Sequence, residues 1–193
     1  DPAADYPAVM LAVDAGFHLH GPNGERVVKA DDFFQGIFTV DLAADEILTK
    51  VSFSPVSSAA YAKLLQRASR FAIVGVAAAL EVGNGVIESA RVALTGAASC
   101  PSRLSHVEAS LAGQPASVEV VEAAAANAGD GVDDLNEDIH ASADYRRAMI
   151  PVFVRRALVQ ALSRVDGGLP HDGDQGSRIS QLAKGVGRIF KGR

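Results

Sequence analysis

Histidine and cysteine side chains stand at two places where their spacing could support chemistry. His18 and His20 lie two residues apart, so on a strand both would face the same side and could bind a metal ion. No third ligand lies nearby, and we interpret both as ordinary strand residues. Cys100 precedes Pro101 at an expected helix start, where the pKa of a thiol can fall. Because no base partner is identifiable, a structural thiol is the favoured interpretation.

An acidic segment is a third place where chemistry could occur. Its side chains are Asp130, Asp133, Asp134, Glu137, Asp138 and His140. A calcium loop of the EF-hand type needs glycine at its sixth position and glutamate at its twelfth, and that spacing is absent. We therefore interpret the segment as a solvated loop. The sequence also contains neither a Gly-x-Ser-x-Gly nucleophile motif nor a common glycine-rich phosphate loop.

Composition is that of an ordinary globular chain. Its 193 residues are 48% hydrophobic and 21% charged, with a net charge of −5. No apolar run is long enough for a membrane-spanning helix, and residues 1–6 do not resemble a signal peptide. The single cysteine excludes an internal disulfide, a cysteine-rich zinc site and an iron–sulfur cluster built from this chain. A cytoplasmic location without a nucleic-acid partner is expected.

The first residues predict a β-hairpin and further short elements. Residues 9–20 alternate in polarity, and the turn at 21–24 would return the chain along 25–29. Two aspartates predict a short helix within 31–36, ended by glycine. A strand over 47–53 should stop before Pro55, because proline withholds a ladder donor.

The next segment predicts a connection and a second hairpin. Residues 57–67 are mostly helix formers or polar, which favours a connection that includes a helical turn. Two β-runs follow at 71–81 and 86–95. Gly83-Asn84-Gly85 between them is a strong hairpin signal.

Three helices are expected after the second hairpin. They are predicted at 101–111, at 118–128 and from Ser142 or Ala143 onward. Pro151 should bend the last one if it begins that early. These elements predict an α+β fold with a small antiparallel sheet and three helices.

The C-terminal segment has a different character. Residues 166–177 are rich in Gly, Asp and Pro and predict a flexible linker. Residues 177–193 carry five positive charges and no acid, so the rest of the chain carries −10 because the whole chain carries −5. This amphipathic tail has three open interpretations: a solvated end, a docking helix for a partner, or a helix in contact with an anionic membrane surface.

Short strings of residues, in order and with matching gaps, carry a family resemblance. The first set is DPAADYPAV at 1–9, GER at 24–26, FFQG at 33–36 and DEIL at 45–48. The second set is YAK at 61–63, RAS at 67–69, RVALTG at 91–96, PSR at 101–103, EASLAG at 108–113 and SADYRR at 142–147. With them the chain resembles the FAD-binding (medium) subunits of molybdenum hydroxylases, of the aerobic carbon monoxide dehydrogenase and xanthine dehydrogenase kind.

The resemblance implies an organisation and an activity. Residues 1–55 would be the C-terminal part of the FAD-binding domain, 56–165 a carbon monoxide dehydrogenase flavoprotein C-terminal-like domain, and 166–193 the linker and tail. The chain would be an oxidoreductase subunit that passes electrons from the iron–sulfur clusters of a partner subunit through FAD to an acceptor. The molybdopterin chemistry would occur on another subunit.

The resemblance also implies particular cofactor contacts. Asp5 matches an acidic residue that contacts the flavin nucleotide, and Leu42 matches a main-chain and apolar contact near the flavin. Residues 61–70 lie where family members approach the isoalloxazine ring, often with a lysine or tyrosine, which makes Lys63 a candidate. Its neighbourhood also contains Leu65, Gln66 and Phe71. No catalytic acid or base and no metal ligand is predicted.

One expected part of the FAD site has no counterpart in the sequence. The family's two glycine-rich segments, whose backbone N–H groups meet the FAD pyrophosphate, would precede Asp1. A chain that starts with Asp and enters an apolar segment at once is consistent with truncation. We therefore expect the chain alone to bind FAD weakly or not at all. A non-enzymatic assembly module and an inactive truncated product are the alternatives.

Overall fold

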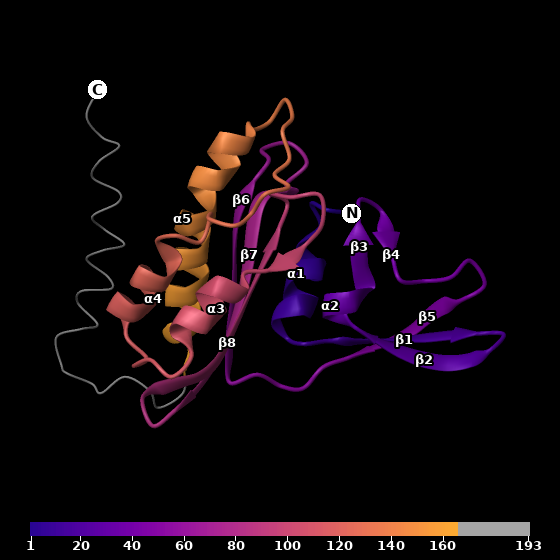
Figure 1. Cartoon of the computed structure of the whole chain (residues 1–193), viewed down its shortest axis with the longest axis horizontal. Helices are drawn as coiled ribbons and strands as arrows, with labels where there is room; N and C mark the ends of the chain where they lie inside the picture. The colour runs from indigo at the N-terminus through magenta and orange to yellow at the C-terminus, as the bar shows by residue number, and fades with distance from the viewer. Residues whose placement is uncertain (166–193) are drawn as a thin grey trace.

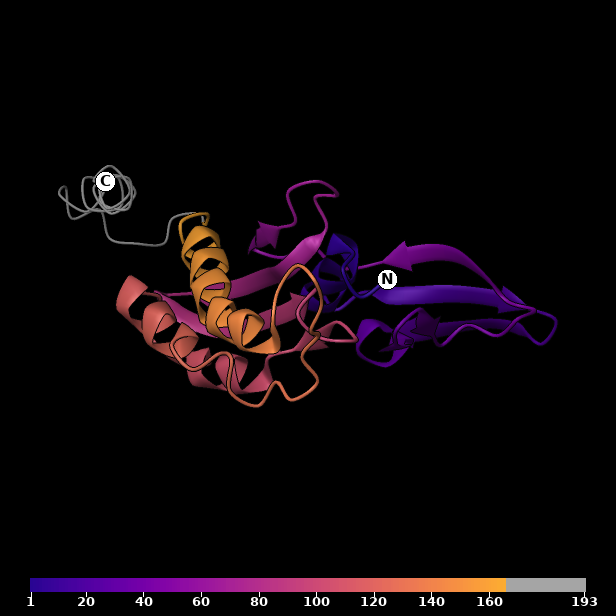
Figure 2. The same ribbon diagram turned by 90° about the horizontal axis from the view of Figure 1, so that it is seen from above.

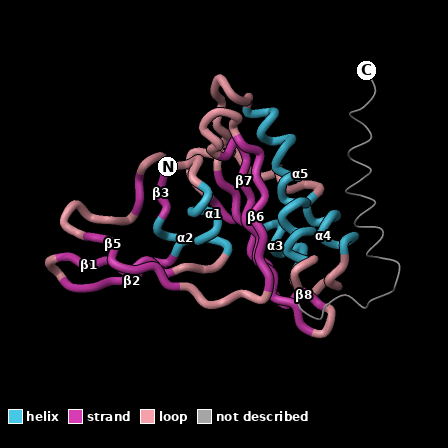
Figure 3. The backbone as a smooth tube through the Cα atoms, turned by 180° about the vertical axis from the view of Figure 1, so that it is seen from behind, coloured by secondary structure: helices cyan, strands magenta, loops and turns pink. Residues whose placement is uncertain are grey.

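A computed structural model describes residues 1–165 as an antiparallel arm joined to a sheet-and-helix body (Figure 1). The arm is a three-stranded sheet in the order β2-β1-β5, and the body holds a four-stranded sheet in the order β6-β7-β8-β9. Helices α3, α4 and α5 lie on one side of the body sheet, away from the arm (Figure 3). The predicted α+β class is confirmed.

The strands are β1 (Gly16–Gly21), β2 (Gly24–Lys29), β3 (Phe34–Gly36), β4 (Thr39–Val40), β5 (Ile47–Ser52), β6 (Ser58–Leu65), β7 (Ala72–Gly83), β8 (Val86–Thr95) and β9 (Ser102–Arg103). The helices are α1 (Asp5–Ala12), α2 (Ala30–Phe33), α3 (Ser105–Leu111), α4 (Val118–Ala125) and α5 (Ala143–Leu162). Strands β3 and β4 form a separate two-stranded hairpin.

The first hairpin is confirmed, but its predicted start at residue 9 is wrong. Residues 9–12 belong to α1, and the first strand begins only at Gly16. Ala8, Leu11 and Ala12 are buried, and this i, i+3, i+4 spacing is helical. The buried helical face therefore prevails over the short alternation that suggested a strand.

The short element near residue 31 is a helix followed by a strand. Helix α2 starts at Ala30 and ends at Phe33, and Phe34 already belongs to β3. The strand predicted over 47–53 is confirmed as β5 to within one residue.

The connection predicted over residues 57–67 is wrong, because most of it forms strand β6. Its partner is β7, in an antiparallel register that sets Tyr61 opposite Ala77 and Lys63 opposite Gly75. Alanine, leucine and lysine favour helix locally, but pairing with a buried central strand decides the outcome. Strands β7 and β8 confirm the second hairpin, with Asn84 at φ 52° and Gly85 at φ 76° in its turn.

Strand β7 is buried on both faces and separates two cores. Val74, Val76 and Leu80 face helices α3, α4 and α5. Ala77 and Ala79 face α1 on the opposite side. Small side chains on that second face let the helix lie close to the sheet, so α1 packs on the body although its residues precede the arm.

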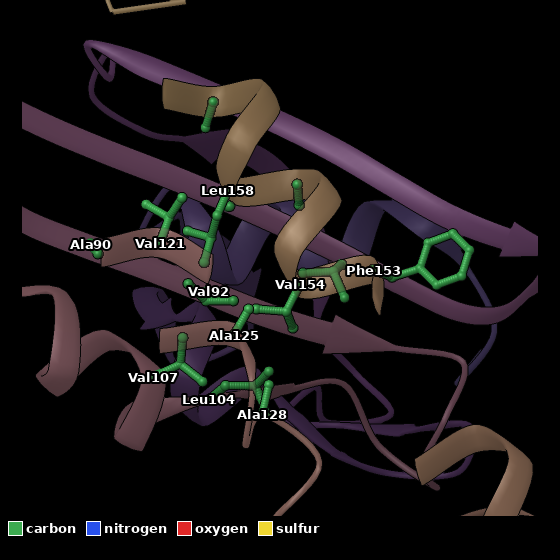
Figure 4. Close-up of a cluster of buried hydrophobic side chains, with 14 of the residues drawn as sticks. Ala90, Val92, Leu104, Val107, Val121, Ala125, Ala128, Phe153, Val154 and Leu158 are labelled. Carbon is green, nitrogen blue, oxygen red and sulfur yellow. The ribbon is translucent and has the colours of Figure 1, made fainter. Parts of the chain in front are cut away.

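The larger core lies between the body sheet and the three helices (Figure 4). Val92 on β8, Val121 on α4 and Leu158 on α5 converge there with no exposed surface. At about 25 cal/mol per Å² of apolar area removed from water, this core is the main source of stability in the body.

Helix α3 starts later than predicted, whereas helix α5 starts where it was predicted. Residues 102–103 form strand β9, so α3 begins at Ser105 rather than near Pro101. Ser142 caps α5, and its hydroxyl accepts a hydrogen bond from the N–H of Tyr145 at 3.2 Å. That cap confirms the predicted start of the last helix.

Pro151 lies inside α5 without ending it. A proline at this position removes the N–H that would meet the carbonyl of Arg147, four residues earlier. A Cβ built on Gly129 would lie 2.8 Å from that carbonyl oxygen. The backbone at Gly129 therefore packs directly against the turn of helix that the proline leaves without its usual hydrogen bond.

The predicted linker at 166–177 and basic tail at 177–193 lie outside the described residues. Among the described residues, no helix has both the length and the apolar character needed to cross a membrane.

Gly96, just after β8, has a backbone that only glycine fits, which gives a stability prediction. Its φ is +80°, and a Cβ there would lie 2.4 Å from the carbonyl oxygen of Ala72. Gly85 has a similar φ of +76° with nothing within 4 Å of a Cβ. Gly85→Ala should lower the free energy of unfolding by about 1–2 kcal/mol through backbone strain. Gly96→Ala should cost about 1–3 kcal/mol more through the clash.

Chemical unfolding of the two variants measures this difference directly. Equal losses of unfolding free energy in Gly85→Ala and Gly96→Ala would mean that the backbone around Gly96 shifts to accommodate the Cβ without a measurable loss of stability.

Candidate functional site

Asp5, Tyr61 and Lys63 form a polar cluster between α1 and the body sheet. Asp5 Oδ1 accepts a hydrogen bond from the Tyr61 hydroxyl at 2.6 Å, and Asp5 Oδ2 accepts one from Lys63 Nζ at 2.6 Å. The Asp5 side chain is 42% exposed, whereas that of Lys63 is 20% exposed. Two of the three predicted cofactor residues therefore lie together, with the carboxylate as the more accessible member.

The segment before α1 is fixed to the body sheet by its backbone. The N–H of Gly96 donates to the carbonyl of Pro2 at 2.7 Å, and the N–H of Ala72 donates to the carbonyl of Ala3 at 3.2 Å. The Thr95 hydroxyl lies 2.8 Å from the carbonyl oxygen of Ala4. These contacts place Asp5, the first residue of α1, over the ends of β7 and β8.

Tyr61 fits over a glycine on the neighbouring strand. A Cβ on Gly75 would lie 2.3 Å from the Tyr61 hydroxyl, so only glycine leaves room for the ring. Burial, and then the hydrogen bond to Asp5, raise the pKa of Tyr61 above its usual value. The phenol is therefore protonated at neutral pH and donates its hydrogen bond to Asp5.

Lys63 also joins the cluster to the turn between β6 and β7. Its ammonium donates a second hydrogen bond to the carbonyl of Arg70 at 2.9 Å. Within the turn, the Gln66 side-chain oxygen accepts from the N–H groups of Ala68 and Ser69. Arg70 itself has a φ of 64°, which is uncommon for a residue with a side chain. The turn ends at Phe71, whose side chain is half exposed.

A cleft of about 390 Å³ lies beside this turn. Its lining consists of Pro2, Ala3, Gln66, Ser69, Phe71, Ala72, Ile73, Gly96, Asn136, Glu137, Asp138, His140 and Arg146. Phe71 offers an aromatic surface, and the lining residues from Asn136 onward are polar or charged. This combination suits a planar ring with polar edges.

The third predicted cofactor residue, Leu42, lies elsewhere, in the loop between β4 and β5. Arg26 on β2 holds that loop: its guanidinium donates to both oxygens of Asp41 at 2.9 and 3.0 Å and to both oxygens of Glu46 at 2.7 and 2.8 Å. The hydrogen bonds from Arg26 lower the pKa of Glu46 to about 2 and also lower that of Asp41. We call these three residues the Arg26 clamp.

The other residues that could support chemistry, two histidines and a cysteine, contact neighbouring protein groups. His18 Nε2 lies 2.7 Å from Ser52 Oγ, and His20 lies 3.6 Å from Glu25. Burial raises the pKa of the Cys100 thiol, so the lowered pKa considered for it is not supported. Within residues 1–165, no group of three or more His, Cys, Asp or Glu side chains is arranged to hold a metal ion.

Two family models match the chain. The model described as the FAD binding domain in molybdopterin dehydrogenase matches residues 1–57. The model described as the CO dehydrogenase flavoprotein C-terminal domain matches residues 59–161, which is more than half of the chain.

Relatives and solved structures agree with these matches. The carbon monoxide dehydrogenase medium chain of Hydrogenophaga pseudoflava is 34% identical over 84% of this chain, and the nicotine 6-hydroxylase medium subunit of Paenarthrobacter nicotinovorans is 32% identical over 85%. This chain spans 58% of the length of both relatives. A structure of carbon monoxide dehydrogenase from Hydrogenophaga pseudoflava superposes with a TM-score of 0.79 at 35% identity, covering 86% of this chain and 58% of that chain. Quinoline 2-oxidoreductase from Pseudomonas putida 86 gives 0.76 at 27% identity, with 84% and 57% covered.

Proposed function

The chain belongs to the family of FAD-binding subunits of molybdenum hydroxylases, and from this membership we propose that residues 1–165 form one side of an FAD site in an electron-transfer subunit. The observation that carries the proposal is the Asp5 carboxylate, held by Tyr61 and by Lys63, which also binds the turn that lines the cleft. A partly exposed, ionised carboxylate is a strong acceptor for a hydroxyl or N–H group of a nucleotide.

The described residues fit part of FAD. Asp5 supplies an acceptor, and Phe71 supplies an apolar surface for a ring. The pyrophosphate needs several positioned N–H donors, and the sequence offers no glycine-rich phosphate loop for them. Within residues 1–165, the proposed site would therefore be a nucleotide-and-ring surface without a pyrophosphate cradle.

Each residue of the site has a definite role in this proposal. FAD, when bound, supplies the redox chemistry. Asp5 would bind a nucleotide group, and Lys63 would neutralise Asp5 while fixing the turn through the carbonyl of Arg70. Phe71 would pack against a ring and keep water from it. Leu42 would add an apolar and main-chain contact from the clamped loop.

The organisation and partners follow from the same membership. We assign residues 1–55 to the FAD-binding domain, 56–165 to the flavoprotein C-terminal-like domain and 166–193 to a linker and tail. Electrons would enter from an iron–sulfur subunit and leave to a separate acceptor, and a molybdopterin subunit would carry out the hydroxylation. The medium-chain names of the relatives support membership of such a complex.

A second candidate function is a non-enzymatic assembly module of the same complex. Strand β5 favours it, because all six of its residues are exposed and it forms an edge of the arm sheet. An edge strand offers unpaired backbone groups to another chain. Copurification with partner subunits in the absence of bound flavin would support this function instead.

Equilibrium titration with FAD tests the proposed function. We expect saturable but weak binding, with a Kd on the order of 100 µM, or about 5.5 kcal/mol, and loss of the flavin on gel filtration. Arg155→Met, which removes the exposed Arg155–Glu122 ion pair on α5 and α4, serves as a control with unchanged binding.

Two results of this titration would overturn parts of the proposal. Flavin retained near stoichiometry after gel filtration would mean that the described residues hold far more of the site. A signal that rises linearly without saturation would remove the FAD site from this chain.

A further inference from the structure

The hairpin β3–β4 and the two residues after it form an exposed apolar finger, residues 34–42. Its outward side chains are Ile37 at 54% exposed, Phe38 at 78%, Val40 at 36% and Leu42 at 37%. These four apolar side chains lie close together on one short hairpin, and the described part of the chain does not bury them.

The tip of the finger is also strained. Gly36 pairs with Thr39, so Ile37 and Phe38 are the two turn residues. Phe38 has a φ of 51°, in the left-handed region that favours glycine and asparagine. Two features disfavour a bulky aromatic residue at this position: the left-handed backbone conformation is strained, and the ring is exposed to water. Residues held in this way gather at ligand-binding positions.

The base of the finger is rigid. The Phe34 ring lies edge-on to those of Phe17 and Phe33, with centroids 5.6 and 5.4 Å apart. The N–H of Asp41 donates to the carbonyl of Phe33 at 2.8 Å, and the Arg26 clamp holds the Asp41 carboxylate. The exposed tip is therefore presented in a fixed orientation rather than on a loose loop.

The finger lies beside the start of the chain. Figures 1 and 2 both place β3 and β4 next to the N-terminus. The finger lies within residues 1–57, which match the FAD binding domain model, and an exposed aromatic ring there suits a stacked planar ring. We propose that Phe38 contacts a ring of the flavin nucleotide, and that Arg26 is the positioning residue that holds the finger. This inference rests on the proposed FAD site and adds a second, aromatic contact to it.

Tryptophan fluorescence provides the test, because the chain contains no tryptophan. Three variants each introduce one reporter: Phe38→Trp in the finger, Phe71→Trp in the cleft, and Phe53→Trp after β5 as an exposed control. On titration with FAD, we expect saturable quenching in the first two variants with matching midpoints. Phe53→Trp should show only the absorbance correction that free tryptophan shows.

The three reporters separate failure of the finger from failure of the FAD site. Quenching of Phe71→Trp without quenching of Phe38→Trp would overturn the finger contact and leave the proposed function standing. Absence of quenching in both would overturn the finger contact and the proposed function together.

A second variant distinguishes a ligand contact from a structural role. Phe38→Gly removes the ring and accepts the left-handed φ, so its Tm should not fall, while Kd for FAD should rise about five- to tenfold. Phe38→Tyr should restore the affinity. Asn84→Gly, which changes a residue with φ 52° in the distant β7–β8 turn, should leave the Kd unchanged. A lower Tm with unchanged Kd in Phe38→Gly would make Phe38 a structural residue and overturn the inference.

The clamp has its own measurement. Arg26→Met should speed hydrogen exchange at the amides of Leu42 and Ala43 and raise the Kd for FAD, because the finger loses its fixed base. Unchanged exchange at those amides would remove Arg26 as the positioning residue.

Discussion

Replacing Arg146 with methionine should lower the free energy of unfolding by about 3–5 kcal/mol, the range for breaking a buried pair by removing one partner. Arg146 is only 3% exposed, on the first turns of α5. Its guanidinium donates to the carbonyl oxygens of Ile73 at 2.7 Å and Gly96 at 3.1 Å, and to the Asp138 carboxylate at 2.7 Å. Methionine fills a similar volume and satisfies none of these acceptors.

The effect should be large because Arg146 joins three parts of the body. Ile73 lies on β7, Gly96 follows β8, and Asp138 lies in the loop before α5. Gly96 in turn donates to Pro2 in the segment before α1. One nitrogen of the guanidinium, Nε, has no hydrogen-bond partner among the described residues. The loss of unfolding free energy in Arg146→Met should therefore fall toward the lower end of the range.

Urea unfolding of three variants measures this contribution. Arg147→Met is the matched control, because Arg147 is the exposed neighbour on the same helix and makes one hydrogen bond, to the carbonyl of Gly129. It should lose less than about 1 kcal/mol. The loss of unfolding free energy in Arg146→Lys should lie between those of Arg146→Met and Arg147→Met. If Arg146→Met and Arg147→Met lost the same unfolding free energy, water would be able to replace Arg146 as the hydrogen-bond donor to the carbonyls of Ile73 and Gly96.

Local turn chemistry explains which elements were predictable from the sequence. The hairpin of β7 and β8 follows from Gly83-Asn84-Gly85, because those residues favour the positive φ that the turn adopts. Strand β6 was missed, because its alanine, leucine and lysine residues carry no local strand signal and only pairing with β7 makes it a strand. Helix α1 was missed for the opposite reason: its short alternation resembled a strand.

The candidate site was predictable only in part. Family resemblance identified Asp5 and Lys63, and the structure brings them to 2.6 Å, but whether they contact flavin stays a prediction. Tyr61 belongs to the family string at 61–63, but its role depends on strand β6, which local patterns did not predict. Arg26 also belongs to a family string, GER at 24–26, but nothing local indicated its role, because its partners Asp41 and Glu46 are 15 and 20 residues away. Contacts between such distant residues depend on the fold and cannot be seen in local patterns.

Asp5→Asn should raise the Kd for FAD about 10- to 100-fold, because hydrogen bonds to charged groups contribute about 1.5–3 kcal/mol. The amide keeps the shape of the side chain but removes the negative charge, so it becomes a weaker acceptor for the nucleotide. Tyr61 and Lys63 also lose their ionised partner, which loosens the side chain that they hold. The measurement is an equilibrium titration with FAD, with thermal unfolding in parallel.

Asp14→Asn is the matched control for this substitution. Its side chain is 42% exposed, as is that of Asp5. It lies two residues beyond the C-terminal end of α1, and its carboxylate is 3.6 Å from the Arg91 guanidinium. The control should leave the Kd within twofold of the parent chain. An equal rise in both variants would trace the effect to overall charge and remove Asp5 from the site.

A double-mutant cycle with Lys63→Met then decides how Lys63 acts. If Lys63 serves only to hold and neutralise Asp5, its loss should weaken FAD binding in the parent chain and have little further effect once Asp5 is asparagine. If Lys63 contacts the flavin nucleotide itself, the two losses should add. Its ammonium already donates to Asp5 and to the carbonyl of Arg70, leaving one N–H for a ligand. We therefore expect the non-additive result, with Lys63 as a positioning residue and Asp5 as the contact.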